Sequence, residues 1–125
     1  MASGFRWLCV LCFTGAALRH AADLWHGGWL PYNDFPLWTN IFWTTLTFLD
    51  PLAALMLWLR PRLGAGLALA IMLVDVGINT YWAIQTGLSG VLGVTTLVAQ
   101  TLFLGAVMGG FPLLWSLGLP RVNKA

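Results

Sequence analysis

Four apolar stretches, separated by short polar or Gly- and Pro-containing connections, make up almost the whole chain. They cover approximately residues 5–25, 37–59, 63–84 and 92–115. A helix rises about 1.5 Å per residue, so roughly 20 apolar residues are enough to cross the hydrocarbon core of a bilayer. The pattern predicts an all-α, polytopic integral membrane protein. Its four transmembrane helices would form one bundle, with residues 1–125 as a single membrane domain.

The connections and the aromatic residues support these boundaries. The first connection contains Gly27, Gly28, Pro31 and Pro36, residue types that interrupt helices and favour turns. Tryptophan and tyrosine gather near the span ends, as in the aromatic belts of membrane proteins. We interpret these residues as interface anchors, some of which can also line the mouth of a ligand site. They are Trp25, Trp29, Tyr32, Trp38, Tyr81 and Trp82 at one interface, and Trp7, Trp58 and Trp115 at the other.

Composition strengthens the membrane assignment. Of the 125 residues, 59% are hydrophobic and 8% are charged, whereas roughly 25% of an average soluble domain is charged. The few cations are also unevenly placed. Two flank Pro61 in the second connection, and the others outside the spans lie near the two ends of the chain. By the positive-inside rule, both termini and this connection are expected to be cytoplasmic.

This scattered charge forms no basic stripe, so nucleic-acid binding is not expected. The compact connections and few Lys and Arg residues suit a bacterial inner, or plasma, membrane.

Polar residues inside the spans are the main indication of function. Arg19, His20 and Asp23 lie in the outer third of the first span, and Asp50 and Asp75 lie about halfway along the second and third. Ionisable groups at such depth are expensive and normally face the bundle interior or a wet cavity. The sequence therefore predicts a polar funnel that opens outward and narrows to two carboxylates at mid-membrane.

The balance of charge sharpens this prediction. Arg19 and Asp23 are i,i+4 neighbours and can pair on one helix face. No cation in the sequence lies at the depth of Asp50 and Asp75. Two unpaired carboxylates close together in a low dielectric cannot both stay ionised. One or both must be protonated, or an external cation must neutralise them.

We therefore predict a ligand-binding site for an amphipathic molecule. Its cationic head would lie near the two deep aspartates, and its apolar body among Trp43, Phe48 and Trp82. The candidate ligand-binding residues are Arg19, His20, Asp23, Trp43, Asp50, Asp75, Asn79, Trp82 and Gln100. For several of them a structural role is the alternative. Arg19 and Asp23 can form an ion pair at the interface, and Asn79 and Gln100 can form interhelical hydrogen bonds.

Other motifs point to packing more than to chemistry. Cys9 and Cys12 are either two small apolar residues on one helix face or a redox pair. Gly105 and Gly109, one turn apart, permit close helix contact, within the bundle or in a homodimer. No cofactor or metal is expected, because the chain lacks the Cys and His set of a zinc site and a pair of well-separated haem ligands. We assign no catalytic residue.

Three segments resemble a known family. They are ADLWHGGWLP in the first span and connection, WTNIFWTTLTFLDPL in the second span, and VDVGINTYW in the third. Their layout is similar to that of the EXPERA domain, the four-helix fold of the emopamil-binding sterol isomerase and the sigma-2 receptor. The resemblance implies an intramembrane pocket for a sterol-like or cationic amphiphile, with Asp23 and either Asp50 or Asp75 as counter-ions.

The family also suggests what an activity would be. The sterol isomerase pairs a histidine with glutamates, and this chain contains no glutamate. His20 with Asp23 would have to approximate that pair, so we expect binding rather than a lipid or sterol isomerase-like reaction. Two alternatives are a proton- or cation-coupled small transporter and an accessory subunit of a larger membrane complex.

Overall fold

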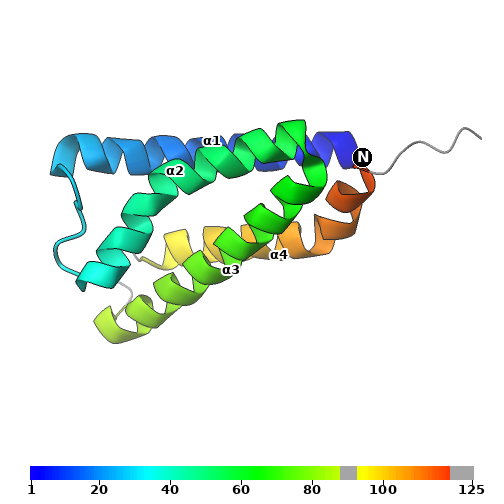
Figure 1. Ribbon diagram of the computed structural model, residues 1–125. Coiled ribbons are helices and arrows are strands. Elements are labelled where there is room, and N and C mark those ends of the chain that lie inside the picture. Colours follow the sequence, from blue (N-terminus) through cyan, green and yellow to red (C-terminus); the bar gives the residue numbers. More distant parts are fainter. Residues whose placement is uncertain (88–92, 119–125) are drawn as a thin grey trace, which may run out of the picture.

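The computed structural model describes residues 1–87 and 93–118. This part of the chain forms four helices: α1 (Ala2–Gly27), α2 (Leu37–Leu59), α3 (Pro61–Thr86) and α4 (Val94–Ser116). Consecutive helices run in opposite directions and pack on one another, and α1 also touches α4, more lightly (Figure 1). We call the end with the N-terminus and the α2–α3 turn the proximal end. The end with the α1–α2 loop, residues 28–36, is the distal end.

The all-α fold and its helix boundaries agree closely with the prediction. α2 has the predicted bounds, α3 is two residues longer at each end, and α1 contains the predicted first span. The predicted start of the fourth span, position 92, lies outside the described residues. α2, α3 and α4 are each long and apolar enough to cross a membrane. α1 is not among these helices, because the polar residues in its distal third lower its mean hydropathy.

Prolines and glycines shape the helix ends. Pro61 occupies the first turn of α3, where its missing N–H leaves no intrahelical hydrogen bond unmade. The same helix ends at Gly87, whose φ of 79° is left-handed and therefore suits glycine. Pro51 lies inside α2 without ending it. The helix bends near its middle (Figure 1), as expected of an interior proline.

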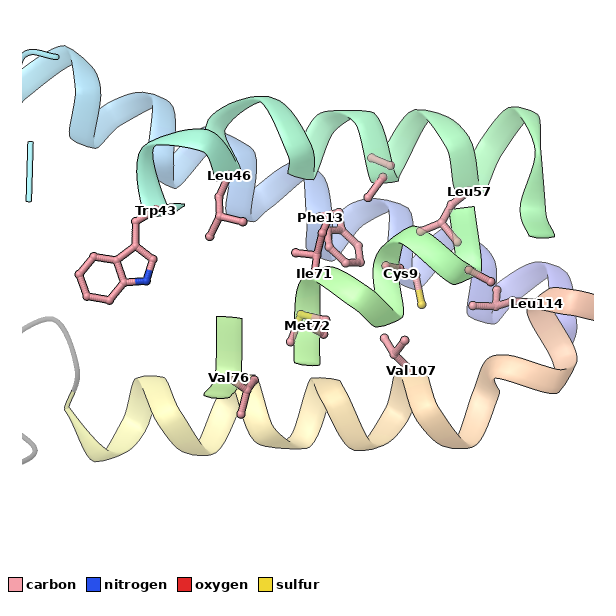
Figure 2. Packing of buried hydrophobic residues seen from close by; sticks show 14 of the residues in the cluster. Cys9, Phe13, Trp43, Leu46, Leu57, Ile71, Met72, Val76, Val107 and Leu114 are labelled. Atoms are coloured by element: carbon pink, nitrogen blue, oxygen red, sulfur yellow. The ribbon is translucent and has the colours of Figure 1, made fainter. Parts of the chain in front are cut away.

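The proximal half of the interior is filled by apolar side chains. Figure 2 shows them pointing from all four helices into one common core. Cys9 is completely buried in it, and both cysteines are free thiols. This core extends past the middle of the bundle, and its other large or fully buried members include Phe13 from α1, Leu46 and Leu57 from α2, Ile71 and Met72 from α3, and Val107 and Leu114 from α4.

Close helix contact involves other glycines than the predicted pair. A methyl group added to Gly64 would overlap the backbone of Leu57, and one added to Gly110 would overlap the ring of Phe5. By contrast, no described atom lies within 4 Å of a Cβ built on Gly105 or Gly109, and both are exposed. Their proposed packing within the bundle is therefore wrong, because the inward face of α4 is displaced from them.

The α2–α3 contact gives a stability prediction. Gly64→Ala should lower the free energy of unfolding by about 1–3 kcal/mol, because the added methyl group forces the two backbones apart. Gly66→Ala is the matched control, since no described atom stands within 4 Å of its added methyl group. Thermal unfolding of both variants in the same detergent measures the difference. Equal midpoints would show that the helices do not approach so closely.

Candidate functional site

The distal half of the interior combines buried polar side chains with apolar ones such as Trp43 and Leu46. The buried polar or charged side chains of the described residues are Thr39, Asn40, Thr44, Asp50, Asp75 and Asn79. They come from α2 and α3. Groups buried at this depth need partners within the protein, because hydrocarbon supplies none. The distal half is therefore organised by hydrogen bonds, whereas the proximal half is organised by apolar packing.

Asn79 is the centre of one hydrogen-bond network. Its Oδ1 accepts a hydrogen bond of 2.8 Å from Trp43 Nε1. Its Nδ2 donates to Asp75 Oδ1 at 3.1 Å and to Gln100 Oε1 at 2.9 Å. Gln100 Nε2 also lies 3.4 Å from Asp75 Oδ2. One amide thus links α2, α3 and α4 and holds the Asp75 carboxylate in place.

Asp50 has a different neighbour. It is 3% exposed, and His20 Nε2 lies 3.9 Å from its Oδ2. The sequence predicts no cation at this depth and pairs His20 with Asp23. The helix rotation instead turns one imidazole nitrogen toward Asp50, so α1 supplies a group that can carry positive charge beside it.

Tyr32 joins the polar groups of α1. Its hydroxyl donates to Asp23 Oδ2 at 2.9 Å and lies 2.8 Å from His20 Nδ1. Arg19 Nε lies 3.4 Å from Asp23 Oδ1, as the i,i+4 spacing predicts. Burial raises the pKa of the Tyr32 phenol well above its usual range, and the hydrogen bond to Asp23 raises it further. The phenol therefore keeps its proton at neutral pH.

Tyr32, predicted to be an interface anchor or to line the mouth of a ligand site, turns inward and lines the site. Asn40 holds the loop in this position. Its Oδ1 accepts from the Tyr32 backbone N–H at 3.1 Å, and its Nδ2 donates to the Leu30 carbonyl at 2.9 Å. Leu30 has a φ of 59°, a left-handed conformation that costs a residue with a Cβ roughly 1–3 kcal/mol. Asn40 is thus the positioning residue that the sequence analysis missed.

Aromatic packing fixes the same loop. The Phe35 ring lies edge-on between Trp43 and Trp82, with centroid distances of 4.7 and 5.4 Å. The Tyr32 ring also meets Trp43 edge-on, at 5.2 Å. These contacts make the loop part of the bundle interior.

Two adjoining cavities lie among these groups. The larger, of about 510 Å³, is lined by Ala16, Arg19, His20, Asp23, Tyr32, Trp43, Asp75, Asn79, Thr96 and Gln100, all of which except Ala16 carry a polar group on the side chain. The smaller, of about 290 Å³, is mostly apolar and is lined by Cys12, Phe13, Ala16, His20, Asp50, Ile71, Met72, Asp75, Ala99, Gln100 and Phe103. Ala16, His20, Asp75 and Gln100 line both cavities.

Most of the predicted ligand-binding residues therefore meet in one region. Trp82 lines neither cavity, and its Nε1 donates instead to Thr39 Oγ1 at 3.0 Å. Phe48 is 58% exposed, so its predicted place beside the apolar part of a ligand is wrong. Its position on α2 points it away from the bundle, and Phe13 and Met72 line the apolar cavity instead.

Among the described residues, no group of three or more His, Cys, Asp or Glu side chains is arranged to hold a metal ion. The chain matches no protein-family model, no curated protein and no solved structure. The resemblance to the EXPERA domain thus has no support from these comparisons. What is established is a four-helix protein with three helices of membrane length and a buried polar site.

The Asn79 network gives a second stability prediction. Asn79→Ala should destabilise the protein by about 1–3 kcal/mol, because the Trp43 N–H and one oxygen each of Asp75 and Gln100 lose their partner. Gln85→Ala removes an amide from an exposed position of the same helix and is the control. Thermal unfolding in detergent measures both. An Asn79→Ala midpoint equal to that of the control would contradict the network.

Proposed function

We propose that this protein is an integral membrane protein that binds a small amphipathic ligand with a cationic head. One observation carries the proposal: a cavity lined by many polar side-chain groups adjoins a mostly apolar cavity, and Asp75 lines both. A molecule that fills both cavities must itself be polar at one end and apolar at the other. Its charge would lie beside a carboxylate that has no Lys or Arg partner among the described residues.

The polar cavity supports a small cationic head. Its volume of about 510 Å³ falls within the usual range of roughly 300–1,000 Å³ for ligand sites. Asp23 is already paired with Arg19, so Asp75 is the carboxylate free to attract a cation. Trp43 adds an aromatic ring to the same lining, and such rings attract organic cations through their negative faces.

The apolar cavity supports a hydrocarbon body. Phe13, Ile71, Met72 and Phe103 bring aromatic and aliphatic side chains from three helices. Methionine adapts readily to varied apolar shapes. An alkyl chain or a sterol-like ring system fits this chemistry better than a polar solute does.

The closed proximal half supports binding over transport. Cys9, Leu57, Val107 and Leu114 are completely buried there. A transported solute needs access to both faces, and a closely packed apolar core offers no polar path. The cavities therefore serve a ligand that enters and leaves from the distal side.

We further propose that α1 is a fourth span, with both termini in the cytoplasm. Its 26 residues correspond to about 39 Å, longer than a hydrocarbon core of about 30 Å. His20 lines the cavities, and the Arg19 side chain is 67% exposed, so its long stem can extend to the interface. The polar third of α1 is thus accommodated without facing lipid.

Membrane topology tests this directly, because four spans put both termini on one side and three put them on opposite sides. Green fluorescent protein fused before Met1 or after Ala125 should fluoresce, since it matures in the cytoplasm. Alkaline phosphatase inserted after Trp29 should be active, since it needs the outer face. Termini on opposite sides would exclude α1 as a span.

Ligand binding can be tested with octyltrimethylammonium, using octanol as the uncharged comparison. At a concentration a hundredfold above its dissociation constant, a ligand that binds the folded state alone stabilises it by about 2.7 kcal/mol. We expect this from the ammonium compound and much less from octanol. Asp75→Asn, which keeps the side-chain size, should weaken ammonium binding at least about tenfold, as loss of a buried charge partner does.

Asp34→Asn is the matched control, because Asp34 is an exposed carboxylate of the distal loop. Thermal unfolding in nanodiscs, read with and without each compound, gives the stabilisation. Equal stabilisation of the wild type and Asp75→Asn would remove the carboxylate from the proposed site.

A further inference from the structure

Four side chains form a continuous path from the distal surface to the buried Asp50. Tyr32 Oη donates to Asp23 Oδ2 at 2.9 Å, and His20 Nδ1 lies 2.8 Å from Tyr32 Oη. The other nitrogen of the same imidazole, Nε2, lies 3.9 Å from Asp50 Oδ2. A small rotation of either side chain brings this last pair within hydrogen-bond distance.

Exposure decreases steadily along this path. The Asp23 side chain is 23% exposed, His20 is 18% exposed, and Asp50 is 4% exposed. The first group is therefore accessible from outside the bundle, and the last is not.

The number of hydrogens on each group determines which atom is the donor in each hydrogen bond. The Tyr32 hydroxyl has one hydrogen and gives it to Asp23. The oxygen of Tyr32 must then accept from His20, so the neutral imidazole carries its hydrogen on Nδ1. Its Nε2 is left with a lone pair that faces Asp50. This nitrogen can therefore act as a base toward a protonated Asp50 carboxyl group.

We propose that this path carries protons between Asp50 and the distal surface, and that a cation bound in the cavities exchanges with a proton by this route. The exchange rests on the proposed binding function, whereas the proton path does not. His20, Tyr32 and Asp23 are already within hydrogen-bond distance, and the His20–Asp50 pair needs only a side-chain rotation, so no rearrangement of the helices is required.

The proton transfer balances in two steps. The Asp50 carboxyl group gives its proton to His20 Nε2, leaving a carboxylate and an imidazolium. His20 Nδ1 then releases its hydrogen to Tyr32 Oη as the phenol hydrogen passes to Asp23 Oδ2. The products are a neutral imidazole with its hydrogen on Nε2, an intact phenol and a protonated Asp23, which loses its proton to water. One proton has moved outward, and no electron has been transferred.

Other titratable groups explain why a cation and a proton compete. Asp75 of α3 and Cys12 of α1 line the same cavity as Asp50, and Arg19 pairs with Asp23 at the surface. α4 brings Gln100 and contains no titratable side chain between Val94 and Ser116. Two carboxylates facing one cavity repel each other when both are ionised. A proton or a ligand cation relieves this repulsion equally well.

The path is tested without ligand by infrared spectroscopy after a rapid pH jump. The C=O stretch of the Asp50 carboxyl group, assigned by its loss in Asp50→Asn, reports protonation. Tyr32→Phe removes only the hydroxyl and keeps the ring that packs on Trp43. It should slow the response roughly a hundredfold, the usual contribution of a positioned proton-transfer group. Tyr81→Phe changes an exposed tyrosine at the same end and should have no effect.

His20→Gln interrupts the path at a second point and should also slow the response. It provides the test if Tyr32→Phe does not fold. Wild-type rates in the folded variants would overturn the path. An Asp50 band that does not change between pH 4 and pH 9 would overturn it too.

The exchange is tested separately with octyltrimethylammonium, which carries no exchangeable proton. Its binding should release about one proton per ligand, as linkage requires when a cation replaces a proton. A pH-indicator dye measures the number and the rate, and Tyr32→Phe should release the same number more slowly. Binding without proton release would overturn the exchange. A wild type that binds no ammonium compound would end the proposed binding function, while the infrared result would still decide the path.

Discussion

A polar group within a bilayer must find its partner inside the protein, because an unpaired one in hydrocarbon costs several kcal/mol. This constraint governs the whole distal half of the bundle. Asn79 forms hydrogen bonds with an indole, a carboxylate and a second amide, and these bonds connect three helices. Asn40 does the same for two backbone groups of the distal loop. Because a buried polar group needs a hydrogen-bond partner, these residues are costly to bury. The same need makes them favour one packing arrangement, since few others would pair their donors and acceptors.

The two halves of the bundle contribute differently to folding and to function. Apolar packing in the proximal half, with close helix contact at Gly64 and Gly110, supplies rigidity without directional bonds. Hydrogen bonds in the distal half hold side chains apart at fixed positions, which leaves space between them. Asp75 lies where the polar and apolar parts of that space meet. The cavity is therefore a direct result of a sequence whose buried polar residues lie in the middle or toward the distal end of α2 and α3.

The sequence was sufficient for the helices and for most residues around the cavities, because hydrophobic periodicity and the burial of polar residues are local signals. It was insufficient where the answer depends on helix rotation or loop path. His20 faces both Tyr32 and Asp50 because of the angle at which α1 packs on α2, which no residue spacing encodes. Phe48, Gly105 and Gly109 were misplaced for the same reason. The inward turn of Tyr32 depends on Asn40, whose position at the start of an apolar span was the one available signal.

The partners of Tyr32 also bear on how the protein is made. α1 precedes α2 in the chain, and its Arg19–Asp23 pair is complete within that one helix. The partners of His20, however, come later in the chain. They are the Tyr32 hydroxyl, 12 residues further on, and Asp50 on α2. The α1–α2 hairpin is thus the smallest segment in which the polar face of α1 is fully satisfied. The polar face of α1 is therefore completed only by the following loop and α2, so these segments are expected to acquire their structure as a unit.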